Sequence, residues 1–185
     1  MSIIFENVSK MIDKKDFTLL FLLKTRILVL ETINYKCYNE KNINTGGINM
    51  KILIICSKAF YKDIAPIKEK LEQNGHVVEL PNSYYEPDAE KKSWALGEEA
   101  HSEFKARMFR MSEERIATMD AVLTLNFDKN GKKNYIGGAT FIEIYEAFMK
   151  NKKIYLYNDI PEGMLYDEIS GFSPVVINGD LDLIK

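Results

Sequence analysis

Cysteine and histidine are scarce in this chain. Two cysteines and two histidines occur among its 185 residues, and the cysteines, Cys37 and Cys56, belong to no C-x-x-C pair and no Cys/His cluster. Because zinc sites of the usual spacing need such clusters, we expect no metal site. Cys56 lies inside an apolar run, which favours a buried structural thiol. The low cysteine content also fits a reducing, cytoplasmic location.

An excess of charge of one sign is missing as well. The 25 Lys and Arg residues nearly balance the 27 Asp and Glu residues, and the formal net charge is −2. Proteins that bind nucleic acid or membrane surfaces usually display a basic excess, so we expect neither partner. Phosphorylated small molecules need only a few local basic groups, and this composition allows them.

Long apolar runs and the common nucleotide-binding glycine motifs are also absent. The most apolar stretch, residues 17–30, is interrupted by Lys24 and Arg26 and is too short to span a bilayer. No G-x-x-x-x-G-K-[ST] loop and no G-x-G-x-x-G fingerprint occurs, which argues against a P-loop ATPase and a nicotinamide dehydrogenase. A G-x-S-x-G elbow is missing too, which removes the commonest hydrolase triad. We therefore expect no cofactor.

The chain divides near residue 50. Residues 1–49 mix apolar runs with Lys- and Asn-rich stretches and end in the turn-rich segment NINTGGIN, so we expect an N-terminal extension that is helical or disordered. A second interpretation is a mis-assigned start, because Met50 opens a strand and Gly46-Gly47 can be encoded by a purine-rich ribosome-binding sequence. In both interpretations, residues 50–185 form the domain.

Strands alternate with helices from Met50 onward. Five short apolar segments are typical of strands in a parallel sheet, and they span residues 51–56, 76–80, 120–126, 153–157 and 174–177. Segments with helical spacing lie between them, at residues 61–74, 98–118 and 139–151. We expect Gly75 to end the first helix in a left-handed conformation. The alternation predicts an α/β fold, with a doubly wound parallel sheet of about five strands in three α/β/α layers.

Ligands bind such sheets at the carboxyl ends of the strands. This rule points to the loops at residues 57–61, 82–88 and 127–140. Ser57 could line the pocket, and Tyr84 and Tyr85 either stack on a base or cover core edges. The arginines at 107, 110 and 115 either meet a phosphate or form a solvated helix face, and we expect no chemistry at His101.

The glycine turn and helix at residues 134–147, NYIGGATFIEIYEA, are the most informative segment. Gly137 and Gly138 let the backbone approach a ligand, and the helix N-terminus offers unpaired N–H groups and a positive dipole. Glu143 is expected in the first turn, where the dipole keeps a carboxylate ionised near neutral pH. Such a carboxylate can act as a nucleophile or stabilise a sugar cation.

A structural interpretation of Glu143 competes with the catalytic one. Thr140 and Glu143 fit the capping box S/T-x-x-E, in which the glutamate only bonds backbone N–H groups. Glu146 and Lys150 lie on the same helix face and are expected to form a surface ion pair. The local pattern by itself favours the capping role.

Residues 120–147, DAVLTLNFDKNGKKNYIGGATFIEIYEA, resemble the nucleoside 2-deoxyribosyltransferase-like superfamily, which includes deoxynucleotide N-glycosidases. The likeness spans Met50 to about Lys185 and is greatest to an uncharacterised branch of that superfamily. It implies a flavodoxin-like sheet, a small-molecule nucleoside or nucleotide as the partner, and a homo-oligomer. The implied activity is cleavage or transfer of an N-glycosidic bond.

The resemblance also assigns residues by position. Glu143 matches the nucleophilic glutamate, and Ser57 lies in the loop that contacts sugar or phosphate. The residues that match the sugar-cradling loop are Gly137, Gly138 and Thr140.

Two positions depart from the superfamily pattern. Tyr145 stands where a glycine is usual, and Gly137 replaces a substrate-holding aspartate, for which Asp128 or Asn134 could substitute. Both departures favour the alternative of a non-catalytic nucleotide-binding or sensing module with the same fold. A purely structural flavodoxin-like domain is the third alternative.

Overall fold

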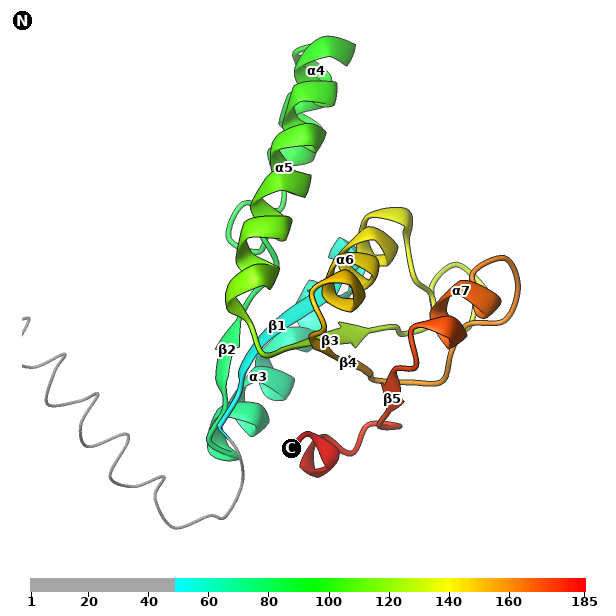
Figure 1. The fold of residues 1–185 in the computed structure, drawn as a ribbon. Coiled ribbons are helices and arrows are strands. Elements are labelled where there is room, and N and C mark those ends of the chain that lie inside the picture. The colour runs from blue at the N-terminus through cyan, green and yellow to red at the C-terminus, as the bar shows by residue number, and fades with distance from the viewer. Residues whose placement is uncertain (1–48) are drawn as a thin grey trace, which may run out of the picture. The chain divides into compact units, whose positions relative to one another are not determined.

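The computed structural model describes residues 49–185. Except for Asn49, the residues of the predicted N-terminal extension lie outside this part, and so do both interpretations of it. A single parallel sheet has the strand order β2-β1-β3-β4-β5 (Figure 1). Its strands are β1 (Lys51–Cys56), β2 (Val77–Glu79), β3 (Ala121–Leu125), β4 (Lys153–Leu156) and β5 (Val175–Val176). This is the order of the flavodoxin-like doubly wound fold, and it confirms the predicted α/β class.

Helices cover both faces of this sheet. They are η1 (Lys58–Asp63), α3 (Ile64–Gln73), α4 (Ala89–Ala95), α5 (Glu98–Thr118), α6 (Gly138–Met149), α7 (Tyr166–Gly171) and η2 (Leu181–Leu183). The predicted bounds of α5 are confirmed, and α3 ends before Gly75, whose φ is +94°. No helix was predicted between residues 80 and 98, which were expected to be irregular through Lys92, but α4 begins at Ala89. Ser93 is the one buried residue of α4, so the sequence of this helix has no apolar periodicity from which it could be predicted.

Successive side chains of β1 point to opposite faces of the sheet. Ile52 and Ile54 belong to the core beneath α3, whereas Leu53 and Ile55 belong to the core beneath α6, together with Ile144. Both faces are therefore buried, which explains why β1 is an uninterrupted apolar run.

Helices α4 and α5 form a hairpin that extends away from the sheet, with α4 beside the N-terminal half of α5 (Figure 1). His101 joins the two helices, because its ring stacks on Trp94 at a centroid distance of 3.8 Å and its Nδ1 lies 3.0 Å from Ser93 Oγ. Within residues 49–185, no helix is long and apolar enough to cross a membrane.

Candidate functional site

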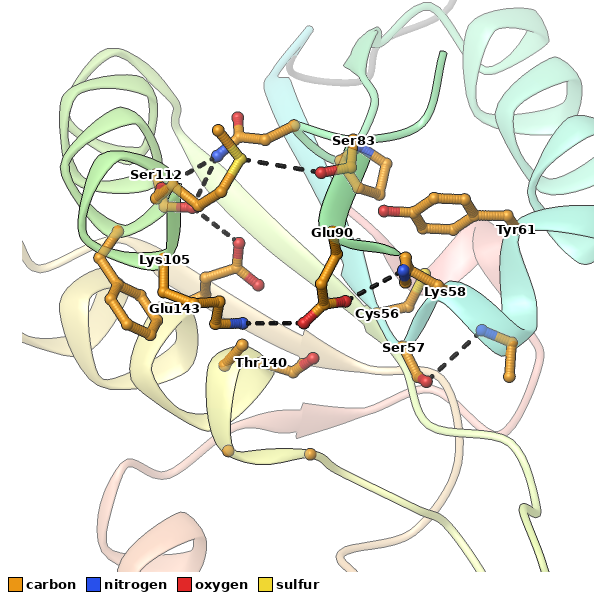
Figure 2. Close-up of a pocket in the computed structure, with 18 of the residues that line it drawn as sticks. Cys56, Ser57, Lys58, Tyr61, Ser83, Glu90, Lys105, Ser112, Thr140 and Glu143 are labelled. Carbon is orange, nitrogen blue, oxygen red and sulfur yellow. Dashed lines mark hydrogen bonds and ion pairs between the residues drawn. The ribbon is translucent and has the colours of Figure 1, made fainter. Parts of the chain in front are cut away.

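A cavity of about 520 Å³ opens at the carboxyl ends of β1 and β3. Its walls come from the loop after β1, the loop after β2, the middle of α5 and the start of α6 (Figure 2). All three predicted ligand loops contribute residues to it. The cavity thus lies where the topology of a doubly wound sheet places a ligand.

Glu143 lines this cavity from the second turn of α6. Ser112 Oγ on α5 donates a hydrogen bond to Glu143 Oε1 at 2.9 Å (Figure 2). Burial raises the pKa of the Glu143 carboxyl to about 7, and the Ser112 hydrogen bond opposes this rise. The expectation that Glu143 stays fully ionised near neutral pH is therefore wrong, because desolvation outweighs a dipole whose influence fades after the first turn.

The capping role of Glu143 is wrong as well. Helix α6 begins at Gly138 with Gly137 as its N-cap, and no side chain caps it. Thr140 lies inside the helix and is buried, so it occupies a different position from the N-cap of a capping box. Glu143 faces α5 and the cavity, where its carboxyl is available to a ligand.

The expected ion pair between Glu146 and Lys150 is also absent from the described residues. Lys150 Nζ instead pairs with Glu113 Oε1 on α5 at 3.2 Å. Glu146 Oε2 is buried without a hydrogen-bond partner in the part of the chain that the structure describes.

Ser112 belongs to a larger polar network on the α5 wall. Asn82 Nδ2 donates to Ser112 Oγ at 2.9 Å, and Arg115 Nη1 donates to Asn82 Oδ1 at 2.7 Å. Arg115 also pairs with Glu79 through a Nη2–Oε2 contact of 2.6 Å. Arg115 is thus engaged by protein groups rather than free for a phosphate. Asn82 begins one of the predicted ligand loops, whereas no motif in the sequence pointed to Ser112.

Ser57 lines the cavity beside a cation that the sequence reasoning missed. Ser57 Oγ accepts hydrogen bonds from Lys129 Nζ at 2.9 Å and from the Ala59 N–H at 3.5 Å. Lys129 Nζ also lies 4.6 Å from the centre of the Tyr135 ring. Lys129 makes no ion pair among residues 49–185, and it lines the cavity together with the first residues of α6, so both bring positive charge to the cavity wall.

Helix α4 reaches the cavity through Glu90. Its carboxylate pairs with Lys58 Nζ at 3.0 Å and with Lys105 Nζ at 3.6 Å, so it bridges the loop after β1 and α5 (Figure 2). The hydrogen bond from Lys58 is the main reason that the pKa of Glu90 lies below its ordinary value. These ion pairs were not predictable, because α4 itself was expected to be loop.

Cys56 and Tyr61 also line the cavity, together with Glu143. Cys56 was expected to be a buried structural thiol; it is half-buried and lines the cavity. Burial raises the pKa of its thiol to about 12, so the thiol stays protonated and unreactive at neutral pH. Burial also raises the pKa of Tyr61, whose ring packs against Tyr84 at a centroid distance of 5.4 Å. Tyr84 and Tyr85 themselves lie outside the cavity lining.

Asp128 and Asn134 are the two candidate residues that the structure places outside the cavity lining. Asp128 Oδ1 accepts a hydrogen bond from the Asn134 N–H at 3.0 Å, and Asn134 adopts a left-handed φ of +51°. They shape the loop before α6. The candidates that line the cavity are Ser57, Gly137, Gly138, Thr140 and Glu143.

No protein-family model matches this chain, and no curated protein matches it. Within residues 49–185, no group of three or more His, Cys, Asp or Glu side chains is placed to hold a metal ion. Among the described residues, the cavity wall offers the Glu143 and Glu90 carboxyl groups, the Cys56 thiol, the Tyr61 and Tyr135 phenols, and the amino groups of Lys58, Lys105 and Lys129.

Proposed function

We propose that this protein cleaves or transfers the N-glycosidic bond of a nucleoside or nucleoside monophosphate, with Glu143 as the catalytic residue. The observation that carries the proposal is the position of Glu143 in the cavity, with a pKa of about 7. A carboxyl group whose pKa is raised toward neutral pH is typical of catalytic acids and bases, which must change protonation state near the working pH.

The cavity has properties that suit this class of ligand. Its volume of about 520 Å³ lies in the usual range for small-molecule sites. Tyr61, Phe104 and Phe109 offer ring surfaces to a base. Lys129, Ser57 and the start of α6 offer positive charge and donors to a phosphate or a sugar hydroxyl.

In the proposed reaction, an oxygen of ionised Glu143 bonds to C1′ of the sugar while the C1′–N bond breaks. The bonding electrons leave with the base, which takes up a proton from solvent. Water or a second base then bonds to C1′ and loses a proton, and the Glu143 carboxylate is released. Water as the second nucleophile gives hydrolysis, and a base gives transfer.

A sensing module that binds nucleotide without chemistry is the second candidate. The same pKa of about 7 favours it, because a protonated carboxyl can donate a hydrogen bond to a base or sugar. Tyr145 in place of glycine and the lack of an aspartate in the cavity lining also favour it.

One experiment separates these functions. The full chain is incubated with a panel of nucleosides and nucleoside monophosphates, and free base is measured by chromatography beside Glu143→Gln and the control Glu103→Gln, an exposed residue of α5. We expect base release that falls about 10³-fold in Glu143→Gln only. If calorimetry detects binding but no base is released, the sensing module is supported. If the protein neither binds these compounds nor releases base, both proposed functions are contradicted.

A further inference from the structure

A chain of hydrogen bonds leads from Arg115 on α5, through Asn82 at the start of the loop after β2, to Glu143. Arg115 Nη1 donates to Asn82 Oδ1 at 2.7 Å, Asn82 Nδ2 donates to Ser112 Oγ at 2.9 Å, and Ser112 Oγ donates to Glu143 Oε1 at 2.9 Å. Glu79 Oε2 holds the guanidinium in place by accepting from Arg115 Nε at 3.0 Å and Nη2 at 2.6 Å.

The guanidinium of Arg115, the first member of this chain of hydrogen bonds, determines the direction in which each group donates. A guanidinium only donates, so Asn82 must turn its carbonyl oxygen to Arg115 and its NH₂ group to Ser112. The Ser112 oxygen accepts that amide proton, and its own single proton is then directed to Glu143. Every donor in the chain therefore points toward Oε1 of Glu143.

Asn82 also removes the usual alternative for Ser112. A serine inside a helix commonly donates to the carbonyl of the residue four positions earlier, which in α5 is Met108. Asn82 Nδ2 lies 3.3 Å from the Met108 carbonyl oxygen and competes for it. Glu143 is thereby left as the preferred acceptor of the Ser112 hydroxyl.

We infer that Arg115, Asn82 and Ser112 are positioning residues that keep Oε1 of Glu143 a hydrogen-bond acceptor, so that the proton of the neutral carboxyl resides on Oε2. Oε2 is then the oxygen that meets the ligand. The inferred effect on turnover rests on the proposed function, whereas the effect on the protonation of Glu143 does not.

The environment of Glu143 predicts how the chain affects its titration. Burial is the largest influence on its pKa and raises it, and the Ser112 hydrogen bond lowers it. Glu146 on α6 raises the pKa of Glu143, whereas Arg115 and Lys105 on α5 lower it. The other titratable groups in the cavity wall are Cys56, Lys58, Tyr61, Glu90, Lys129 and Tyr135. Loss of this chain of hydrogen bonds should therefore raise the pKa of Glu143 further.

The test is an NMR titration of the Glu143 side-chain carboxyl in the full chain, with Glu143→Gln used to assign its signal. In Ser112→Ala we expect the pKa to rise by about one pH unit, because a hydrogen bond to the charged form is lost. Asn82→Ala should raise it in the same direction, although Asn82 does not contact Glu143. Arg115→Lys should raise it too, since lysine keeps the charge but cannot hold both Glu79 and the Asn82 carbonyl as a planar fork does.

Two variants serve as matched controls. Ser112→Thr retains the hydroxyl and should keep the pKa near that of the unchanged protein. Ser102→Ala removes an exposed hydroxyl from the same helix and should have no effect. Thermal unfolding of each variant identifies any that fail to fold, in which case Asn82→Ala replaces Ser112→Ala as the decisive variant.

An unchanged Glu143 pKa in folded Ser112→Ala or Asn82→Ala would overturn the inference. If the protein releases base, the acidic limb of its pH–rate profile should move with the NMR pKa in each variant. If the pKa rises in the variants but neither the unchanged protein nor any variant releases base, the inference about the hydrogen-bond chain is supported and the proposed function is overturned.

Discussion

Helices α5 and α6 both line the cavity, but the molecule holds them in different ways. Helix α6 packs directly on the sheet, and its Ile144 and Ala147 are fully buried there. Of the 21 residues of α5, the buried ones are Phe104, Ser112 and Ile116, and much of the helix extends beyond the sheet with α4 (Figure 1). Apolar packing anchors α6, whereas α5 depends to a larger extent on polar contacts.

This difference divides the site into two parts with separate tasks. Helix α6 sets where Glu143 lies, because apolar side chains on the same helix fix its position on the sheet. Helix α5 and the loop after β2 influence the charge of Glu143, because Ser112 donates to its carboxyl and Asn82 and Arg115 continue this chain of hydrogen bonds. Position and protonation should therefore respond to different substitutions.

The largest loss of stability is expected on the α6 side. Ile144→Ala removes a side chain with 0% exposure and leaves a cavity between α6 and the sheet, so the free energy of unfolding should fall by about 2–5 kcal/mol. Urea denaturation followed by circular dichroism measures this change. The control Met149→Ala, at 59% exposure on the same helix, should change it by less than about 0.5 kcal/mol. Equal losses in the two variants would contradict the anchoring role of α6.

A change of similar or smaller size is expected where the two parts meet, at Glu143. Its pKa is about 7 in the folded protein against an ordinary 4.5, so the folded protein retains a proton that the unfolded chain loses in this interval. Relative to Glu143→Gln, the free energy of unfolding should fall as the pH rises from about 4.5 to 7, by at most about 3 kcal/mol.

Urea denaturation at several pH values checks this prediction. Below about pH 3.5 the difference between the two proteins should be constant, because Glu143 is then protonated in both the folded and the unfolded state. A stability difference that increases with pH between 4.5 and 7 would show that the folded protein favours the ionised carboxylate, contrary to the desolvated site described above.

The smallest global effect is expected in the α4–α5 hairpin. Glu90→Gln removes the ion pairs with Lys58 and Lys105, whose side chains are partly exposed, so the free energy of unfolding should fall by less than about 1 kcal/mol. Amide hydrogen exchange within α4 should accelerate all the same, because these pairs tie α4 to the rest of the cavity wall.

High salt and a control variant sharpen this last prediction. Ion pairs at the surface are screened, so 0.5 M NaCl should reduce the difference in exchange between the unchanged protein and Glu90→Gln. Glu114→Gln, at an exposed position of α5 and in no ion pair among the described residues, should leave exchange in α4 unchanged. Slower exchange in Glu90→Gln would contradict the bridging role of Glu90.

The fold was predictable where burial leaves a periodic pattern in the chain. The apolar runs of β1 and β3 arise because both faces of the sheet are covered, and Gly75 ends α3 because it adopts a φ that other residues disfavour. Helices α4 and α7 were missed because each buries a single side chain, Ser93 and Ile169 respectively. Without a repeated apolar position, a short polar helix resembles a loop.

The sequence predicted the residues of the candidate site that follow strand ends, but not those that α5 contributes. Ser57, Gly137, Gly138 and Glu143 follow strand ends, and the topology of parallel sheets brings strand ends together. Ser112 and Lys105 lie in the middle of a long amphipathic helix, where no motif distinguishes them from solvated positions. Their role depends on the contact between α5 and α6, which no short segment encodes.

The sequence by itself determined the class of fold, the edge of the sheet that carries the cavity, and the presence of Glu143 beside a glycine turn. Only the tertiary structure decided what state Glu143 is in. The local sequence indicates a helix dipole and a capping box, and both favour an ionised Glu143 carboxylate. Desolvation by the surrounding protein and a hydrogen bond from Ser112 act across space, and burial is the stronger of the two, so the pKa lies near 7.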